Sequence, residues 1–124
     1  MGKRRIRCLK RLGIEETVGD ARQDRSEQAR STYGIEVVVD WLEAKPRSVD
    51  AWIIATPPDT HVAYGLQAVD RGILFFTEAN VTDPRTGELI HRLEKSKIVG
   101  APSHTMRYYA GPRRINEILA SEVI

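Results

Sequence analysis

The chain has 124 residues, of which 41% are hydrophobic and 29% charged, and its formal net charge is +2. This is an ordinary composition for a globular chain, and the length allows one domain or a part of a larger one. No apolar run approaches the roughly 18–20 residues that cross a membrane. The single cysteine, Cys8, excludes an internal disulfide framework and favours a reducing compartment. We therefore expect a cytoplasmic protein.

The positive charge is concentrated at the start of the chain. Six of the 19 basic residues lie in the first twelve positions, which leaves 13 basic against 17 acidic residues, a net charge of −4, over residues 13–124. The apolar segment of a secretory signal does not follow these charges, and Ile6 stands where myristoylation would need Ser or Thr. A nucleic-acid-binding arm and a helix start near an anionic ligand both stay open.

Helices and strands are expected to alternate from the start of the chain. The three-residue spacing of Ile6, Leu9 and Leu12 predicts an amphipathic helix over 3–12, which Gly13 ends. Four further elements are expected before Pro46: a strand over 16–19, a helix over 24–33 capped by Asp24 and stopped by Gly34, a strand over 35–38, and a helix over 39–45.

The clearest strand covers 49–56, is nearly all apolar, and is stopped by Pro57 and Pro58. A continuous apolar run of this length is typical of a strand that is buried on both faces. The elements expected next are a helix over 60–71 capped by Asp59 or Thr60, with Val62, Leu66 and Val69 on one face; a strand over 73–77; a helix over 84–96 with Leu89, Ile90 and Leu93 inward; a strand over 97–101; and a helix over 112–121 with Ile115, Ile118 and Leu119 apolar.

This alternation predicts an α/β fold with a doubly wound parallel sheet, built from right-handed strand–helix–strand units. In such sheets, ligands bind beyond the carboxyl ends of the strands. The first candidate there is Asp20, which lies 18 residues after Gly2, because a carboxylate about 20 residues beyond a Gly-rich turn can bind the hydroxyls of an adenine ribose. The alternative is an Asp that faces water or caps a turn.

Two other strand ends carry candidate binding groups. The Thr56-Pro57-Pro58 sequence forces an extended turn that could lie flat beside a ligand. His61 could touch a phosphate or ribose, or could pack as a satisfied core histidine. Glu78 and Asn80 could reach the same crevice, although a lone Glu at a strand end is usually solvated.

No metal site is expected, because Cys8 and the three histidines (His61, His91 and His104) lack zinc-site spacing. No nucleophile elbow or complete P-loop is present. Tyr108 and Tyr109 beside Arg107 could stack on a flat ring, although an aromatic pair is more often part of a core.

Six segments together resemble one family. They are Met1-Gly2-Lys3-Arg4-Arg5, Val18-Gly19-Asp20-Ala21-Arg22, Thr56-Pro57-Pro58-Asp59-Thr60-His61 with Ala68-Val69-Asp70-Arg71-Gly72, Phe76-Thr77-Glu78, and Met106-Arg107-Tyr108-Tyr109-Ala110-Gly111-Pro112. The chain resembles the amino-terminal domain of the Gfo/Idh/MocA oxidoreductases, which are NAD(P)-dependent enzymes acting on sugars, inositols and related polyols.

The resemblance implies a Rossmann-like sheet that lacks its first strand, so that residues 1–124 would be a partial NAD(P)-binding domain without the carboxyl-terminal substrate domain. An inner strand left out of the order 3-2-1-4-5-6 would leave backbone groups unpaired, and poor stability of residues 1–124 alone is expected. The full-length protein is expected to be a homo-oligomer that takes a small sugar or polyol, with no nucleic-acid or membrane partner.

The resemblance also implies which residues bind NAD, or alternatively NADP. Gly2, Lys3 and Arg4 would face the pyrophosphate, and Asp20 would hold the adenine ribose, although Arg22 could admit a 2′-phosphate. The remaining implied cofactor-binding residues are Thr56, Pro57, Pro58 and His61 along the dinucleotide, and Glu78 and Arg107 towards the nicotinamide.

One departure from the family pattern concerns chemistry. The family usually has Glu-Lys-Pro where this chain has Glu78-Ala79-Asn80, and Ala79 can neither donate a hydrogen bond nor transfer a proton. No catalytic residue is therefore assigned. The alternative function is a non-catalytic module that binds a dinucleotide or a sugar.

Overall fold

The computed structural model describes residues 2–14, 17–20, 22–38, 49–79 and 83–121. The chain divides into two compact units, Met1–Val49 and Asp50–Ile124, and each is described by itself. The helix predicted over 39–45 and the candidate Asn80 lie outside the described residues.

The first unit consists of α1 (Gly2–Arg11), β1 (Thr17–Gly19), α2 (Gln23–Tyr33) and β2 (Glu36–Val38). The strands β1 and β2 are parallel. A small apolar core is formed by Ile6, Ala29, Ile35 and Val37, with Tyr33 packed against it. Both predicted glycine stops are confirmed, because Gly13 and Gly34 have φ of 68° and 63°, which side chains with a Cβ rarely adopt.

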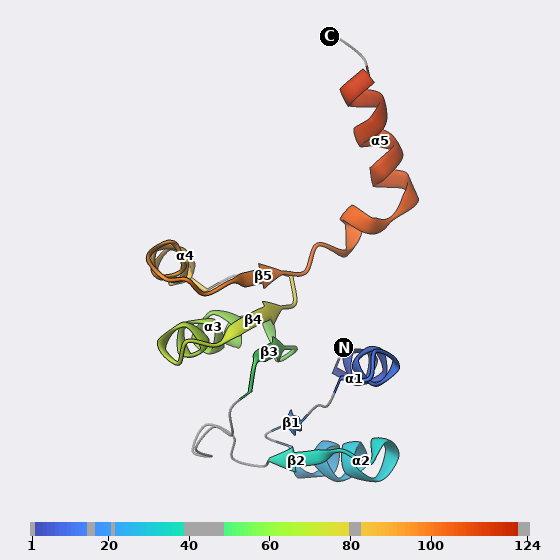
Figure 1. Ribbon diagram of the computed structural model, residues 1–124, viewed down its shortest axis with the longest axis vertical. Coiled ribbons are helices and arrows are strands. Elements are labelled where there is room, and N and C mark those ends of the chain that lie inside the picture. Colours follow the sequence, from blue (N-terminus) through green and yellow to red (C-terminus); the bar gives the residue numbers. More distant parts are fainter. Residues whose placement is uncertain (1, 15–16, 21, 39–48, 80–82, 122–124) are drawn as a thin grey trace. The chain divides into compact units, whose positions relative to one another are not determined.

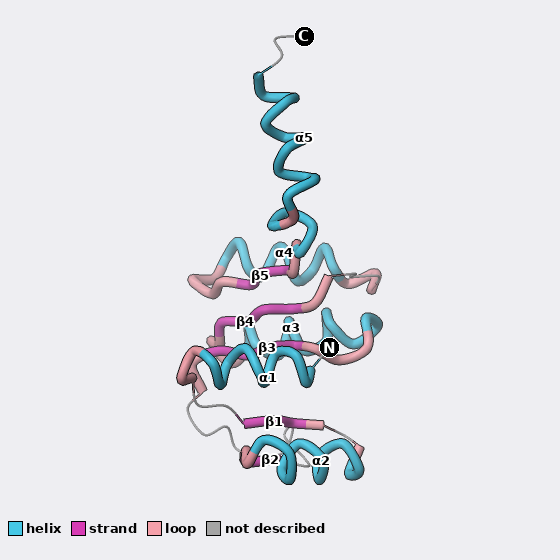
Figure 2. Tube along the Cα trace, turned by 90° about the vertical axis from the view of Figure 1, so that its right-hand side faces the viewer, coloured by secondary structure: helices cyan, strands magenta, loops and turns pink. Residues whose placement is uncertain are grey.

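The second unit begins with β3 (Ala51–Ile54), the 3₁₀ helix η1 (Pro58–Thr60) and α3 (His61–Asp70). It continues with β4 (Leu74–Thr77), α4 (Thr86–Lys95), β5 (Gly100–Pro102), the 3₁₀ helix η2 (Thr105–Tyr108) and α5 (Ala110–Ser121). Figure 2 shows β3, β4 and β5 running alongside one another, and their pairing is parallel throughout.

The pairings β1–β2 and β3–β4–β5 are those that the order 3-2-1-4-5-6 contains on either side of its first strand. Parallel strands joined by helices confirm the predicted α/β fold. The strands are shorter than predicted: β3 covers four of the eight residues in 49–56, and β5 begins at Gly100 rather than at residue 97.

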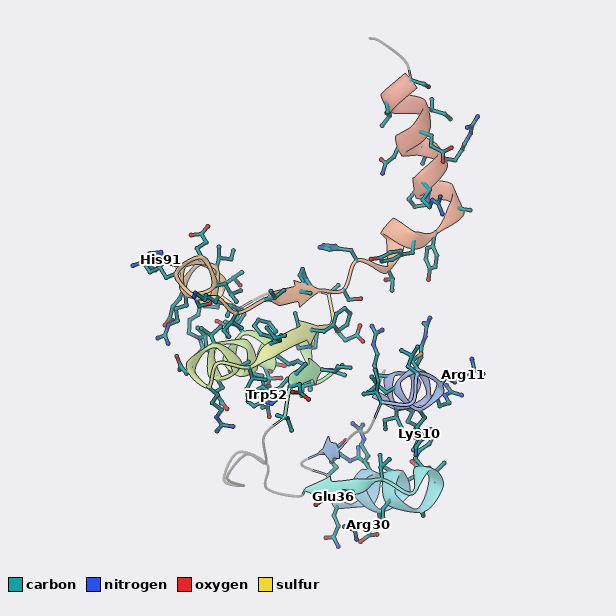
Figure 3. The ribbon with its side chains drawn as sticks, viewed as in Figure 1. Lys10, Arg11, Arg30, Glu36, Trp52 and His91 are labelled. Atoms are coloured by element: carbon teal, nitrogen blue, oxygen red, sulfur yellow. The ribbon has the colours of Figure 1, made fainter. Side chains whose placement is uncertain are left out.

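Helices α3 and α4 cover one face of the three-stranded sheet (Figure 1). On that face Trp52, Ile54 and Phe75 are buried, and Trp52 is labelled in Figure 3. Ile53 and Leu74 alternate with these residues along the strands and so lie on the other face, where they are 40% and 43% exposed. Among the described residues of the second unit, helices cover one face of β3, and the burial on both faces predicted for the strand over 49–56 is not seen within this unit.

The predicted inner face of α4 is corrected at one residue. On α4, Leu89 is buried but Ile90 is 52% exposed, because the helix contacts α3 through Leu89, which lies against Gly65. On α5, Ile115, Ile118 and Leu119 are all exposed.

The predicted helix caps differ in detail from the observed ones. Asp24 lies inside the first turn of α2, where it pairs with Arg22 at the cap position. Thr60 occupies the cap position of α3, but its hydroxyl bonds to the preceding turn and not to the helix. Both polar side chains therefore stabilise the approach to a helix, without a capping bond.

Candidate functional site

The carboxyl ends of β3, β4 and β5 meet at one edge of the sheet. The N–H of Glu78 donates to the carbonyl oxygen of Ile54 at 3.1 Å, and the N–H of Ser103 donates to that of Thr77 at 2.8 Å. These bonds align the residues that follow each strand. The predicted residues Thr56, Pro57, Pro58, His61 and Glu78 are thus brought to this edge, where ligands of open α/β sheets bind.

The turn after β3 exposes two prolines and is held by the residues that follow them. Pro57 and Pro58 are exposed, whereas Thr56 and Thr60 are half-buried. The Thr60 hydroxyl is hydrogen-bonded to the Thr56 hydroxyl at 2.8 Å and donates to the Pro57 carbonyl oxygen at 2.8 Å. The Thr60 N–H reaches that same carbonyl oxygen at 3.0 Å. The turn that exposes the two prolines is therefore held by the hydrogen bonds of Thr60.

His61 is the first residue of α3, yet only 2% of it is exposed. Its Nε2 lies 2.9 Å from the carbonyl oxygen of Thr56. The sequence left open whether this histidine touches a ligand or packs internally. In the structure it packs against the turn that precedes it.

Glu78 is 9% exposed, at the end of β4. Its backbone carbonyl accepts a hydrogen bond from the Thr77 hydroxyl at 3.2 Å, and its N–H bonds to β3. The residue is therefore fixed through its main chain on both sides. The exposed Ala79 follows it and brings only a methyl group to this edge.

Arg107 lies in η2, beyond the end of β5. Its side chain is outside the described part, so its role stays a prediction. The neighbouring Tyr108 and Tyr109 are 80% and 55% exposed, which places neither ring in a core.

In the first unit, α1 starts at Gly2 and has no acidic residue in its first turn. A Cβ added to Gly2 would meet nothing within 4 Å, so the backbone there is open to close approach. Arg4 is exposed, and the Nζ of Lys3 donates to Oε1 of Gln28 at 2.6 Å, which links α1 to α2. A helix start of this kind favours an anion through its free N–H groups and its dipole.

Asp20 follows β1 and holds the turn into α2. Its Oδ1 accepts the N–H of Arg22 at 2.9 Å, and its carbonyl oxygen accepts the Ser26 hydroxyl at 3.1 Å. The turn-capping alternative for Asp20 is thus observed. It leaves the proposed ribose contact untested.

The guanidinium of Arg22 pairs with both carboxylate oxygens of Asp24, at 3.0 Å and 2.6 Å. The hydrogen bonds and charge of Arg22 lower the pKa of Asp24, and those of Asp24 raise the pKa of Arg22. The arginine that could admit a 2′-phosphate is therefore already paired with an acid of its own helix.

Sequence reasoning missed the contributions of Thr60 and Ser103. The sequence predicts Thr60 only as a helix cap, and Ser103, which is 4% exposed, is not among the predicted site residues. The signal for Thr60 is a hydroxyl two residues after the proline pair, because two prolines leave carbonyl groups without neighbouring N–H donors.

Within the described residues, no three His, Cys, Asp or Glu side chains gather in a way that could hold a metal ion. No helix in those residues is long and apolar enough to span a bilayer.

Comparison with family models settles the family. Residues 8–99 match the model of the Gfo/Idh/MocA oxidoreductase family, described as an NAD-binding Rossmann fold. The chain belongs to this family. Its α/β units are those of an NAD-binding Rossmann domain, and the resemblance found in the sequence motifs is confirmed.

Solved structures of several dehydrogenases share the fold of this chain. The chain is 19% identical to myo-inositol 2-dehydrogenase from Lactobacillus plantarum, with a TM-score of 0.85 over 96% of this chain and 38% of that one. The WlbA dehydrogenase from Bordetella pertussis, in complex with NADH and UDP-GlcNAcA, is 16% identical, with a TM-score of 0.84 over 96% and 37%.

A third neighbour is KijD10, a 3-ketoreductase from Actinomadura kijaniata, in complex with NADP and TDP-benzene. It is 20% identical, with a TM-score of 0.73 over 90% of this chain and 35% of that one. This chain therefore spans just over a third of the length of these neighbours. No curated protein sequence matches it significantly.

Proposed function

We propose that the chain binds a nicotinamide dinucleotide and is the cofactor-binding part of an oxidoreductase that acts on a sugar, an inositol or a related polyol. One observation carries the proposal: in a chain of an NAD-binding family, the Thr56-Pro57-Pro58 turn, with both prolines exposed, lies at the carboxyl edge of a parallel sheet and is fixed there by hydrogen bonds. We further propose that the substrate-binding part lies outside residues 1–124.

The start of α1 fits the pyrophosphate of such a cofactor. The first turn of α1 carries no acid, and Gly2 leaves room for a phosphate to approach the backbone. The exposed Arg4 adds positive charge beside this turn. Lys3 adds charge as well, although its amine is held by Gln28. We assign all three to the pyrophosphate.

Asp20 fits an adenine ribose by its place at the end of β1 and by its carboxylate. A carboxylate at this position can accept both ribose hydroxyls and repels a 2′-phosphate. The pairing of Arg22 with Asp24 also reduces the attraction of a 2′-phosphate to Arg22. Both observations support NAD over NADP as the preferred cofactor, with Arg22 the residue through which NADP could still be admitted.

In the second unit, the proline pair offers a flat, apolar surface that a dinucleotide can cover. Thr56, Pro57 and Pro58 are the residues we assign to direct contact, with His61 behind them. Glu78 and Arg107 are assigned to the nicotinamide end of this edge. The buried Glu78 is fixed at its main chain, which suits a group that orients a ligand.

When bound, the nicotinamide supplies a two-electron acceptor for a hydride from the carbinol carbon of the substrate. The residues of this chain bind and orient the dinucleotide. They are assigned no proton transfer, because Ala79 replaces the residue that the family usually places beside the nicotinamide. The hydroxyl proton of the substrate would then pass to a base outside these residues.

A non-catalytic module that binds a dinucleotide or sugar is the second candidate. The observation that favours it is Ala79, which leaves this edge without the usual amine. A module that binds a dinucleotide shares cofactor binding with the enzyme and differs from it in turnover, whereas a module that binds only a sugar shares neither property.

Titration of the complete protein with NADH tests cofactor binding, with circular dichroism to establish that the protein is folded. Turnover of the complete protein with a panel of sugars, inositols and nucleotide sugars then separates the candidates. Reduction of NAD with any panel member supports the enzyme, and binding without turnover supports the module. A folded protein without NADH binding would overturn both the enzyme and the dinucleotide-binding module.

A further inference from the structure

The turn after β3 lacks two backbone hydrogen-bond donors. Two of its residues, Pro57 and Pro58, have no N–H group. The carbonyl oxygens beside them must therefore find donors elsewhere if the turn is to keep one conformation.

The structure supplies those donors from the residues just after the turn. Thr60 serves the Pro57 carbonyl through its hydroxyl and its N–H. His61 serves the Thr56 carbonyl through Nε2, at 2.9 Å. Because a carbonyl oxygen only accepts hydrogen bonds, Nε2 must carry the proton in this contact.

The second ring nitrogen of His61 has no such contact. Nδ1 is buried and has no hydrogen-bond partner among the described residues. With 2% of the residue exposed, the ring is enclosed by its own chain. In its neutral form, the ring therefore carries its proton on Nε2 and a lone pair on Nδ1.

We propose that His61 is a positioning residue: its Nε2–H holds the Thr56 carbonyl and so presents Pro57 and Pro58 to the dinucleotide, without a contact between the ring and the ligand. This inference rests on the proposed function. It replaces the sequence-based alternatives, direct contact or passive packing, with an indirect role in binding.

Two substitutions distinguish the roles of the two ring nitrogens of His61. In His61→Gln, the side-chain amide nitrogen can take the place of Nε2 and still donate to Thr56. In His61→Asn, the shorter side chain mimics Nδ1 and loses that donor. The matched control is His91→Asn, because His91 is an exposed histidine on α4 (Figure 3).

The measurement is the dissociation constant for NADH of each purified, folded variant. We expect His61→Gln and His91→Asn to stay within about threefold of the original chain. His61→Asn should bind about tenfold more weakly, which is the scale of one lost hydrogen bond. Retention by His61→Asn with loss by His61→Gln would assign a ligand contact to Nδ1 and overturn the proposal. Equal affinity of all variants would also overturn it.

A second measurement does not depend on the folding of a variant. Long-range ¹H–¹⁵N spectra of the original chain should show the His61 ring in the tautomer protonated on Nε2, before and after NADH is added. The opposite tautomer would overturn the proposed bond to Thr56. If the original chain binds no NADH, the proposed function itself fails; if it binds and the variants behave alike, only the role of His61 fails.

Discussion

Gly100 of β5 lies against the aromatic ring of Phe75 on β4, so closely that an added Cβ would stand 2.5 Å from Cζ of that ring. The same Cβ would be 3.1 Å from Cδ1 of Leu93 on α4. Because Phe75 is 4% exposed, its ring has little room to give way. The close approach of β5 to the core of the second unit thus depends on a residue without a side chain.

Gly100→Ala should destabilise the chain. Overpacking of a tight core costs about 1–3 kcal/mol, and urea denaturation should show it as a lower midpoint. The matched control is Gly87→Ala on α4, where a Cβ would meet nothing within 4 Å. Alanine should raise stability there by about 0.5–1 kcal/mol through helix propensity. Equal midpoints for the two variants would contradict the packing of Gly100 against Phe75.

Thr60→Val should loosen the turn after β3. The change removes the hydroxyl that bonds to Thr56 and Pro57 while it keeps the shape of the side chain. A loss of about 1 kcal/mol in the free energy of unfolding is expected for this exchange, together with weaker NADH binding. Thr60→Ser keeps the hydroxyl and should restore most of both. A valine variant that binds NADH as the original chain does would show that the hydroxyl does not support the site.

Asp20→Asn should reduce the preference for NADH over NADPH. Asparagine keeps an oxygen that can accept the N–H of Arg22, so the turn into α2 should persist. It loses the negative charge that repels a 2′-phosphate. The ratio of the two dissociation constants, measured at fixed ionic strength, should move towards NADPH by about tenfold or more. An unchanged ratio would remove Asp20 from the ribose site.

The pairing of Arg22 with Asp24 predicts a pH effect. Because the pKa of Asp24 is lowered in the folded chain, the pair stabilises the fold fully above the ordinary aspartate value. That contribution is lost as the pH falls through the lowered pKa. NMR titration of the Asp24 carboxyl carbon should show the lowered pKa, and Arg22→Gln should return it towards the ordinary value. A pKa that does not respond to the substitution would contradict the ion pair.

The sequence predicted the order of elements well, because the signals that carried it are local. A glycine directly after a helical segment predicts a left-handed helix end, and the predicted stops Gly13 and Gly34 both have positive φ. The apolar run before Pro57 is likewise a local signal, and it predicts a strand. The parallel pairings then follow from the alternation of strands and helices.

What the sequence could not predict depends on contacts between elements. Leu89 and Ile90 are equally apolar neighbours, and only the packing of α4 against Gly65 decides which one is buried. The burial of His61 and its bond to Thr56 depend on how the turn folds back on α3. The ion pair of Arg22 with Asp24 could not be predicted either, because an exposed arginine has several possible acidic partners in the sequence.

The measurement that tests the central claim most directly is energy transfer from tryptophan to NADH during titration of the folded chain. The account predicts saturable, one-to-one binding with NADH emission excited through tryptophan, and competition by NAD. A chain that is folded by circular dichroism and shows no saturable transfer or competition would contradict it.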